Sequence, residues 1–165
     1  MPTIIGLDPG LRHTGWGIVK VTGNALQYVA HGVISPSSKL DFAHRLNILH
    51  QELQKVITQY QPEEAAVEET FVNMNASSTL KLGMARGVVL LVPAQHGLKV
   101  AEYATNSVKK TVVGVGHATK DQVALMVERL LYGCKGIKED AADALAVAIC
   151  HVHTSSIENR WKICA

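Results

Sequence analysis

The stretch IIGLDPG, residues 4–10, decides the fold of this chain, and a second apolar run begins at Thr14. This pattern predicts a strand, a turn and a second strand, with Asp8 at the carboxyl end of the first strand. Pro9 fixes the approach to the turn, and Gly10 suits a backbone position with positive φ. Because Asp is depleted in strands, the presence of Asp8 at the end of an apolar strand requires an explanation. Two interpretations stay open at this point: a turn cap, or a ligand for a metal ion or a phosphate.

The composition narrows the class of protein. The chain has 165 residues, of which 47% are hydrophobic and 18% are charged, so we expect one soluble globular domain. Its longest apolar run, 87–94, is far shorter than the roughly 18 residues of a membrane span. The N-terminus has no basic region before an apolar one, so we expect no secretory signal. Three cysteines without a close pair indicate neither zinc nor a redox motif. We therefore expect a reduced, cytoplasmic protein with no membrane partner.

The charges are unevenly distributed along the chain. The net charge is only +2, which alone predicts nothing about nucleic acid. Between residues 73 and 135, however, eight Lys or Arg stand against three acids. This excess is typical either of ordinary solvated helix faces or of a phosphate-binding surface.

Hydrophobic periodicity predicts the order of the elements. We expect strands at 4–8, 14–21, 26–35, 65–68 and 98–103, helices at 40–60, 77–92, 120–132 and 140–153, and a short helical turn at 105–110. Pro93 predicts the end of the second helix. This order predicts an α/β fold with a mixed five-stranded sheet flanked by helices on both faces. We expect one domain over 1–153, followed by a flexible tail over 154–165.

Four acids stand at the ends or starts of these elements. Asp8 and Glu68 close two strands, while Asp140 and Asp143 lie three residues apart at a helix start and share a face. Helix starts favour acids, so the last pair alone has an ordinary explanation. Clustered carboxylates repel one another unless a cation neutralises them. All-oxygen ligands select Mg²⁺ or Mn²⁺, and two such ions suit phosphodiester hydrolysis.

Neighbouring acids leave the ligand set ambiguous. Glu69 follows Glu68, and adjacent strand residues face opposite sides, so only one of them can point toward Asp8. Periodicity alone does not choose between them. Glu139 before Asp140 adds a further acid that resembles a ligand.

Six pieces of the chain together match one family pattern: IGLDPG (5–10), VEETF (67–71), LKLGMARG (80–87), EY (102–103), VKKTVVG (108–114) and DAADALA (140–146). With these pieces in order, the chain resembles the RuvC family of Holliday junction resolvases as far as about His153. The resemblance implies an RNase H-like fold and a homodimer. It implies a structure-selective endonuclease that makes paired, symmetric nicks in strands of like polarity at a four-way DNA junction, in recombination and repair. It also suggests the RuvA–RuvB branch-migration complex as a partner.

The resemblance assigns roles to residues of this chain. Asp8, Glu68, Asp140 and Asp143 would be the catalytic acids that bind Mg²⁺, two ions per site, with Mn²⁺ as a substitute. The family register chooses Glu68 over Glu69. Basic residues near the scissile phosphate would be Lys120 and Lys109, and Phe71 would stack on an unpaired base at the crossover. Further candidates for DNA contacts are Lys110, Lys81 and Arg86.

The helix expected at 77–92 is the candidate dimer seam. Gly83 and Gly87 lie one turn apart and permit a second helix to approach closely, while apolar area comes from Leu80, Met84, Val88 and Leu91. The alternative is an ordinary core helix.

Three other functions compete with the junction resolvase. A YqgF-like nuclease acting on RNA shares the Asp8 motif but would lack the helix start at 140–143. A nucleotide-binding module of the actin and sugar-kinase type also has an Asp and glycines in its first hairpin, yet needs two such domains. A catalytically inactive junction-binding protein is disfavoured because all four acids are present.

Overall fold

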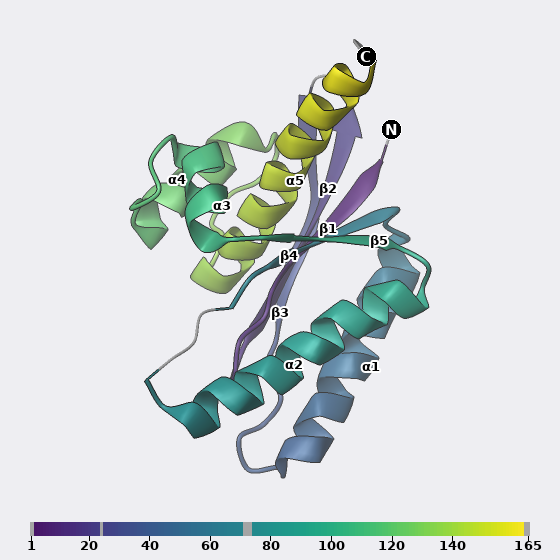
Figure 1. The fold of residues 1–165 in the computed structure, drawn as a ribbon, viewed down its shortest axis with the longest axis vertical. Helices are drawn as coiled ribbons and strands as arrows, with labels where there is room; N and C mark the ends of the chain where they lie inside the picture. The colour runs from purple at the N-terminus through teal and green to yellow at the C-terminus, as the bar shows by residue number, and fades with distance from the viewer. Residues whose placement is uncertain (1, 24, 71–73, 164–165) are drawn as a thin grey trace.

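The computed structural model describes residues 2–23, 25–70 and 74–163, with side chains as far as Ser155. Figure 1 shows the arrangement of its elements. The strands are β1 (Thr3–Asp8), β2 (Thr14–Thr22), β3 (Ala25–Ile34), β4 (Glu64–Glu68) and β5 (Lys99–Tyr103). The helices are α1 (Phe42–Tyr60), α2 (Ala76–Gln95), α3 (Thr105–Val113), α4 (Lys120–Leu130) and α5 (Glu139–Ile163).

The five strands form one mixed sheet in the order β3-β2-β1-β4-β5. Consecutive strands β1, β2 and β3 pair antiparallel, whereas β4 runs parallel to both β1 and β5. Parallel neighbours end at the same edge of a sheet, and Leu7 lies beside Val67 in the register. The acids that follow these two residues, Asp8 and Glu68, therefore close adjacent strands at one edge.

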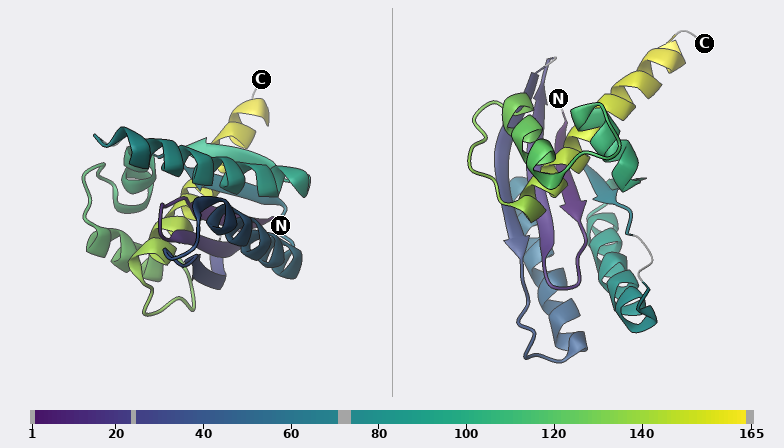
Figure 2. Two further views of the ribbon diagram at one scale, coloured as in Figure 1. Left: turned by 90° about the horizontal axis from the view of Figure 1, so that it is seen from below. Right: turned by 90° about the vertical axis from the view of Figure 1, so that its left-hand side faces the viewer.

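Helices cover both faces of the sheet, which confirms the predicted α/β architecture. Helices α1 and α2 lie on one face, and α3, α4 and α5 lie on the other (Figure 2). Alternate residues of β1 serve the two layers: Ile5 and Leu7 pack with α1 and α2, while Ile4 packs with the opposite helices. Gly6 and Asp8 share the face of Ile4, so the Asp8 side chain lies on the α5 side of the sheet.

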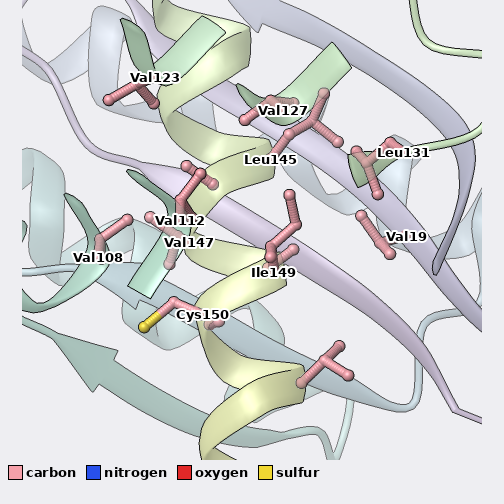
Figure 3. Close-up of a cluster of buried hydrophobic side chains, with 14 of the residues drawn as sticks. Val19, Val108, Val112, Val123, Val127, Leu131, Leu145, Val147, Ile149 and Cys150 are labelled. Atoms are coloured by element: carbon pink, nitrogen blue, oxygen red, sulfur yellow. The ribbon is translucent and has the colours of Figure 1, made fainter. Parts of the chain in front are cut away.

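Helix α5 forms the centre of one hydrophobic core. Its buried residues Leu145, Val147 and Ile149 lie among the apolar side chains of α3 and α4 and of strand β2 (Figure 3). Much of its surface is Ala, including Ala144, which brings the helix backbone close to the strands beneath it. The start of α5 is thereby held against the sheet.

Side-chain caps explain several helix starts. The carboxylate of Asp41 accepts the His44 N–H at the start of α1, and Asn75 accepts the Ser78 N–H at the start of α2. Thr119 and Gln122 form a reciprocal capping box at the start of α4. Expectation and structure agree there to within the usual spread of helix boundaries.

Three expectations are corrected. Helix α2 passes through Pro93 and ends two residues later at Gln95, where the His96 N–H bonds the Val92 and Pro93 carbonyl oxygens at 3.3 and 3.1 Å. Helix α3 reaches Val113 rather than residue 110. Helix α5 continues beyond 153 to Ile163, because extending a formed helix costs far less than starting one. The flexible tail over 154–165 and the domain boundary at 153 stay predictions.

Candidate active site

Asp8 lies where the sheet meets the start of α5. It is the last residue of β1 and is directly followed by the turn at Pro9 and Gly10. A methyl group on Gly10 would stand 2.1 Å from the His13 carbonyl oxygen, so close backbone approach requires glycine there. The expected positive φ at Gly10 is wrong, since the positive-φ glycines of the described chain lie elsewhere.

The structure resolves the ambiguity between the two adjacent glutamates. Glu68 shares a strand face with Ala66, which packs in the α5 core, and its side chain is partly buried. Glu69 is exposed, and its N–H bonds the Tyr103 carbonyl oxygen at 2.9 Å. Glu68 is therefore the glutamate on the same side of the sheet as Asp8.

Asp140 and Asp143 lie in the first turns of α5, where the helix lies flush on the sheet. A methyl group on Gly6 of β1 would stand only 2.0 Å from the Ala144 carbonyl oxygen. This contact draws the start of α5 onto the strand that ends in Asp8. The aspartates of the helix consequently lie beside the strand acids.

Electrostatic coupling links the four acids. Burial, followed by the neighbouring carboxylates of Glu68, Asp143 and Asp140, raises the pKa of Asp8 to about 8. Burial is also the main cause of the raised pKa values of Glu68 and Asp143. The four acids that the sequence singled out thus form one set of repelling, partly desolvated carboxylates.

Lys120 supplies a positive charge to this set. Its ammonium nitrogen lies 3.5 Å from a carboxylate oxygen of Asp143 and 3.5 Å from one of Glu139. Burial works against the charged ammonium, yet the surrounding carboxylates outweigh it and raise the pKa of Lys120. Glu139 is 67% exposed and pairs with the lysine from outside the cluster. Lys120 is thus held at the edge of the acids by the start of α5.

The other candidate DNA contacts have different surroundings. Lys109 is partly buried on α3 and its charge lowers the pKa of Glu68 and of Asp143, while Lys110 is exposed. Lys81 lies 5.8 Å from the centre of the Phe42 ring. Arg86 pairs with Glu102 at 2.6 Å. Its helix, α2, covers the face of the sheet opposite to α5, so this pair lies apart from the four acids (Figure 2). Phe71 lies outside the described residues.

Thr105 was missed as a site residue by the sequence analysis. Its hydroxyl donates a hydrogen bond to the Glu68 carboxylate, across the β4–β5 edge. Thr105 is the first residue of α3, directly after the cap residue Ala104. Its signal in the sequence was only a threonine after a strand, which is typical of an ordinary helix start.

The metal-binding capacity of the cluster follows from its donor type. In the part of the chain that the structure describes, no three His, Cys, Asp or Glu side chains are grouped so that they could already hold an ion. The four acids nevertheless offer only carboxylate oxygens, which suit Mg²⁺ or Mn²⁺ rather than zinc. Their mutual repulsion is the kind that a bound cation relieves.

This sheet topology, with acids closing β1 and β4 beside the start of α5, defines an RNase H-like nuclease domain. The family model described as crossover junction endodeoxyribonuclease RuvC matches residues 4–151. The protein of that name from Paramagnetospirillum magneticum is 61% identical over 150 residues, covering 91% of this chain and 90% of the relative. The Rhizobium meliloti protein is 56% identical over 150 residues, covering 91% and 88%. The chain belongs to the RuvC family, as the sequence motifs predicted.

Solved structures agree with this assignment. The structure of Thermus thermophilus RuvC in complex with a Holliday junction substrate has a TM-score of 0.88 and 33% identity, covering 96% of this chain and 97% of that one. The yeast mitochondrial Holliday junction resolvase Ydc2, at 12% identity and a TM-score of 0.65, shares the fold. Among the described residues, no helix is long and apolar enough to cross a membrane.

Proposed function

We propose that this protein resolves four-way DNA junctions by metal-dependent hydrolysis of one phosphodiester in each of two strands of like polarity. The observation that carries the proposal is the convergence of Asp8, Glu68, Asp140 and Asp143, from two strands and one helix, at one edge of the sheet. A single carboxylate such as Asp8 could be explained as a cap of the turn that follows it. Four carboxylates beside a single lysine need a bound cation to balance their charge, and such a cation would in turn attract a negatively charged substrate.

Two Mg²⁺ ions, with Mn²⁺ as a substitute, fit the donor chemistry of these four side chains. When bound, the ions activate water and stabilise the oxygen that leaves the phosphorus. The four acids would hold the ions, and Thr105 would fix the orientation of Glu68 through its hydrogen bond. Lys120 pairs with Asp143 and carries a full charge toward the place where the phosphate would lie.

The basic residues around the acids supply affinity for the sugar-phosphate backbone. Lys109 already acts electrostatically on two of the acids, and exposed Lys110 and Lys81 extend the positive surface along α3 and α2. Such contacts position DNA without reading its sequence. Arg86 serves this role only if its pair with Glu102 opens. Phe71 is assigned the base-stacking role at the crossover.

A homodimer with two such sites matches the two-fold symmetry of an open junction. The side of α2 that points away from the sheet carries exposed Leu80, Met84 and Leu91, which supports this helix as the seam. The RuvA–RuvB complex stays a proposed partner. A cytoplasmic location stays a prediction from the cysteine usage.

An incision assay tests the function. A labelled four-way junction and a plain duplex of the same sequence are incubated with the protein in Mg²⁺, in Mn²⁺ and in EDTA. We expect paired nicks in the junction alone, only with metal, and none from Asp8→Asn, which should still bind the junction. Binding without incision in either metal would support an inactive junction-binding protein instead. Equal cleavage of duplex or RNA would support a different RNase H-like nuclease.

A further inference from the structure

His151 is a buried titratable side chain that the proposed chemistry does not use. It lies on α5 and is only 3% exposed. Its Nε2 lies 2.5 Å from a carboxylate oxygen of Glu64, and its Nδ1 lies 2.7 Å from the Tyr103 hydroxyl. The rings of His151 and Tyr103 meet edge to face with their centres 5.7 Å apart. Both polar edges of the imidazole are therefore engaged by the strands beneath α5.

One tautomer of the ring is compatible with both partners. With a proton on Nε2, the ring donates to the Glu64 carboxylate, and Nδ1 accepts from the Tyr103 hydroxyl. This arrangement leaves no polar atom of the buried ring unsatisfied. Fully satisfied buried networks make the packing around them rigid and unique. His151 thus fixes where this part of α5 lies on β4 and β5.

The same face of α5 carries the acids. His151 follows Asp140 by eleven residues, which is about three helical turns, so both side chains project from nearly the same side of the helix. A shift or rotation of α5 at His151 would consequently move Asp140 and Asp143 relative to the strand acids.

The partners of His151 also lead to Glu68. Glu64 and Glu68 lie at the two ends of β4 and on the same strand face, because they are four residues apart. Tyr103 pairs directly with Glu68 in the β4–β5 register, and Thr105 donates to the Glu68 carboxylate. The network therefore fixes β4 and β5 near the site as well as α5.

The buried surface of α5 explains why such a fixed point is needed. Three of the seven residues between Asp143 and His151 are alanine: Ala144, Ala146 and Ala148. Ala144 and Ala148 lie against Gly6 of β1, and their small side chains oppose sliding along the strand less than larger ones would. The larger Leu145, Val147 and Ile149 pack with α3, α4 and β2. Catalytic groups need placement to about half an ångström, so a small slip of the helix would separate the acids.

We propose that His151 is a positioning residue for the active site: its hydrogen bonds to Glu64 and Tyr103 set the position of α5 on the sheet and hence the spacing of the four acids. The inference rests on the proposed role of those acids.

Substitutions in the two partners test it while His151 stays in place. Tyr103→Phe removes only the hydroxyl, and Glu64→Ala removes the acceptor that Glu64→Gln retains. The matched control is Tyr28→Phe, which removes a similar tyrosine–histidine bond, 3.0 Å from Tyr28 to His31, on the far strand β3. Mn²⁺ binding is measured by calorimetry, junction cleavage in single turnovers at saturating metal, and junction affinity in EDTA.

We expect Tyr103→Phe and Glu64→Ala to weaken Mn²⁺ binding and to slow cleavage by about tenfold each, the usual scale for lost support of metal ligands. Junction affinity should change by less than about twofold, because phosphate contacts supply it. Glu64→Gln and Tyr28→Phe should behave as wild type. If Tyr103→Phe only lowers the unfolding temperature and leaves Mn²⁺ affinity and cleavage rate unchanged, the network is merely structural and the proposal is overturned.

Failure of the proposed function would give a different result. A wild-type protein that cleaves no junction overturns the function, while Mn²⁺ affinity still compares the variants. Should wild type bind no Mn²⁺ either, amide hydrogen exchange over residues 141–148 decides the inference. Faster exchange there in Tyr103→Phe than in Tyr28→Phe supports it, and equal exchange overturns it.

Discussion

The backbone of Gly15 touches the backbone of Asp140. A methyl group on Gly15 would stand 2.0 Å from the Asp140 carbonyl oxygen, and Gly15 is also the antiparallel partner of Asp8. The absent side chain of Gly15 is thus what allows an acid of α5 to lie beside an acid of β1. The site depends on a glycine that carries no chemistry itself.

Gly15→Ala should therefore destabilise the fold as well as the site. The added methyl meets backbone atoms, which cannot rotate away, so we expect a loss at the upper end of overpacking costs, about 3 kcal/mol of unfolding free energy. Urea unfolding measures it. Gly116→Ala is the control, because its nearest neighbour would lie 3.6 Å away, an ordinary contact. Equal stability of the two variants would contradict the close approach of α5.

The raised pKa of Asp8 predicts how stability depends on pH without metal. Folded Asp8 keeps its proton up to a pKa of about 8, whereas the unfolded chain releases it near 3.8. Between these values the folded state binds more protons, so stability falls as pH rises. One pKa unit corresponds to about 1.4 kcal/mol, so the change across this range amounts to a few kcal/mol.

Asp8→Asn should remove most of this decline. We expect the variant to gain stability over wild type as pH rises from about 4 to 8 in EDTA, measured by thermal unfolding at fixed ionic strength. Saturating Mg²⁺ should reduce the difference, because a cation bound by the native state stabilises the ionised carboxylate. A wild-type stability that rises with pH over this range would show that Asp8 is ionised in the folded protein.

The two adjacent glutamates provide a matched pair for the chemistry. Glu68→Gln removes a carboxylate from the cluster, whereas Glu69→Gln changes an exposed side chain on the other side of the strand end. We expect junction cleavage to fall by orders of magnitude in the first and to change by less than about threefold in the second. Single-turnover rates on one junction compare them directly. The reverse result would mean that Glu69 points to the acids.

Lys120 should act on turnover more than on affinity. Its ammonium is held at 3.5 Å from Asp143, close to the acids, and would meet the negative charge that grows on the phosphate. Lys120→Ala should therefore lower the cleavage rate by about a hundredfold with little change in junction affinity. Lys110→Ala, an exposed lysine on α3, should instead weaken binding modestly and leave the rate at saturation unchanged. Equal losses of binding and rate in Lys120→Ala would make it an ordinary DNA contact.

Much of this fold could be predicted because its signals are local. The alternation in β1 and the caps at Asp41, Asn75 and Thr119 act within a few residues, and they set the elements nearly where the sequence indicated. Four acids at element ends likewise indicated a site, because nothing else explained them together. The family motifs added the choice of Glu68, which the alternation alone left open.

The remaining features depend on contacts between distant segments. Thr105, whose hydroxyl donates to Glu68, follows the end of the neighbouring strand. Glycine is required at position 15 because a carbonyl oxygen of α5 lies against it. Neither contact leaves a periodic trace in the sequence. Pro93 is the reverse case, in which a strong local signal is overridden by its surroundings. The helix continues through this proline because buried packing in α2 and the nearby helix end reduce the loss of helix stability.

We predict that the exposed side of α2 forms the dimer interface. A methyl group on Gly83 or on Gly87 would meet nothing within 4 Å, so neither glycine serves packing inside the protomer. Each costs about 1 kcal/mol of helix stability against alanine, which an interface between two such helices would explain. Leu80 and Met84 are 62% and 46% exposed on the same helix.

Met84→Glu should therefore produce monomers, whereas Leu125→Glu, at a 50% exposed leucine on α4, should leave the oligomeric state unchanged. Sedimentation velocity distinguishes the two.

A mixed dimer of wild type and Asp8→Asn, made with separable tags, should nick a junction once, because each protomer would cut one strand. Denaturing and native gels show whether the product is a nicked junction or two resolved duplexes. Efficient resolution by the one-site dimer, or by the Met84→Glu monomer, would contradict the two-site arrangement.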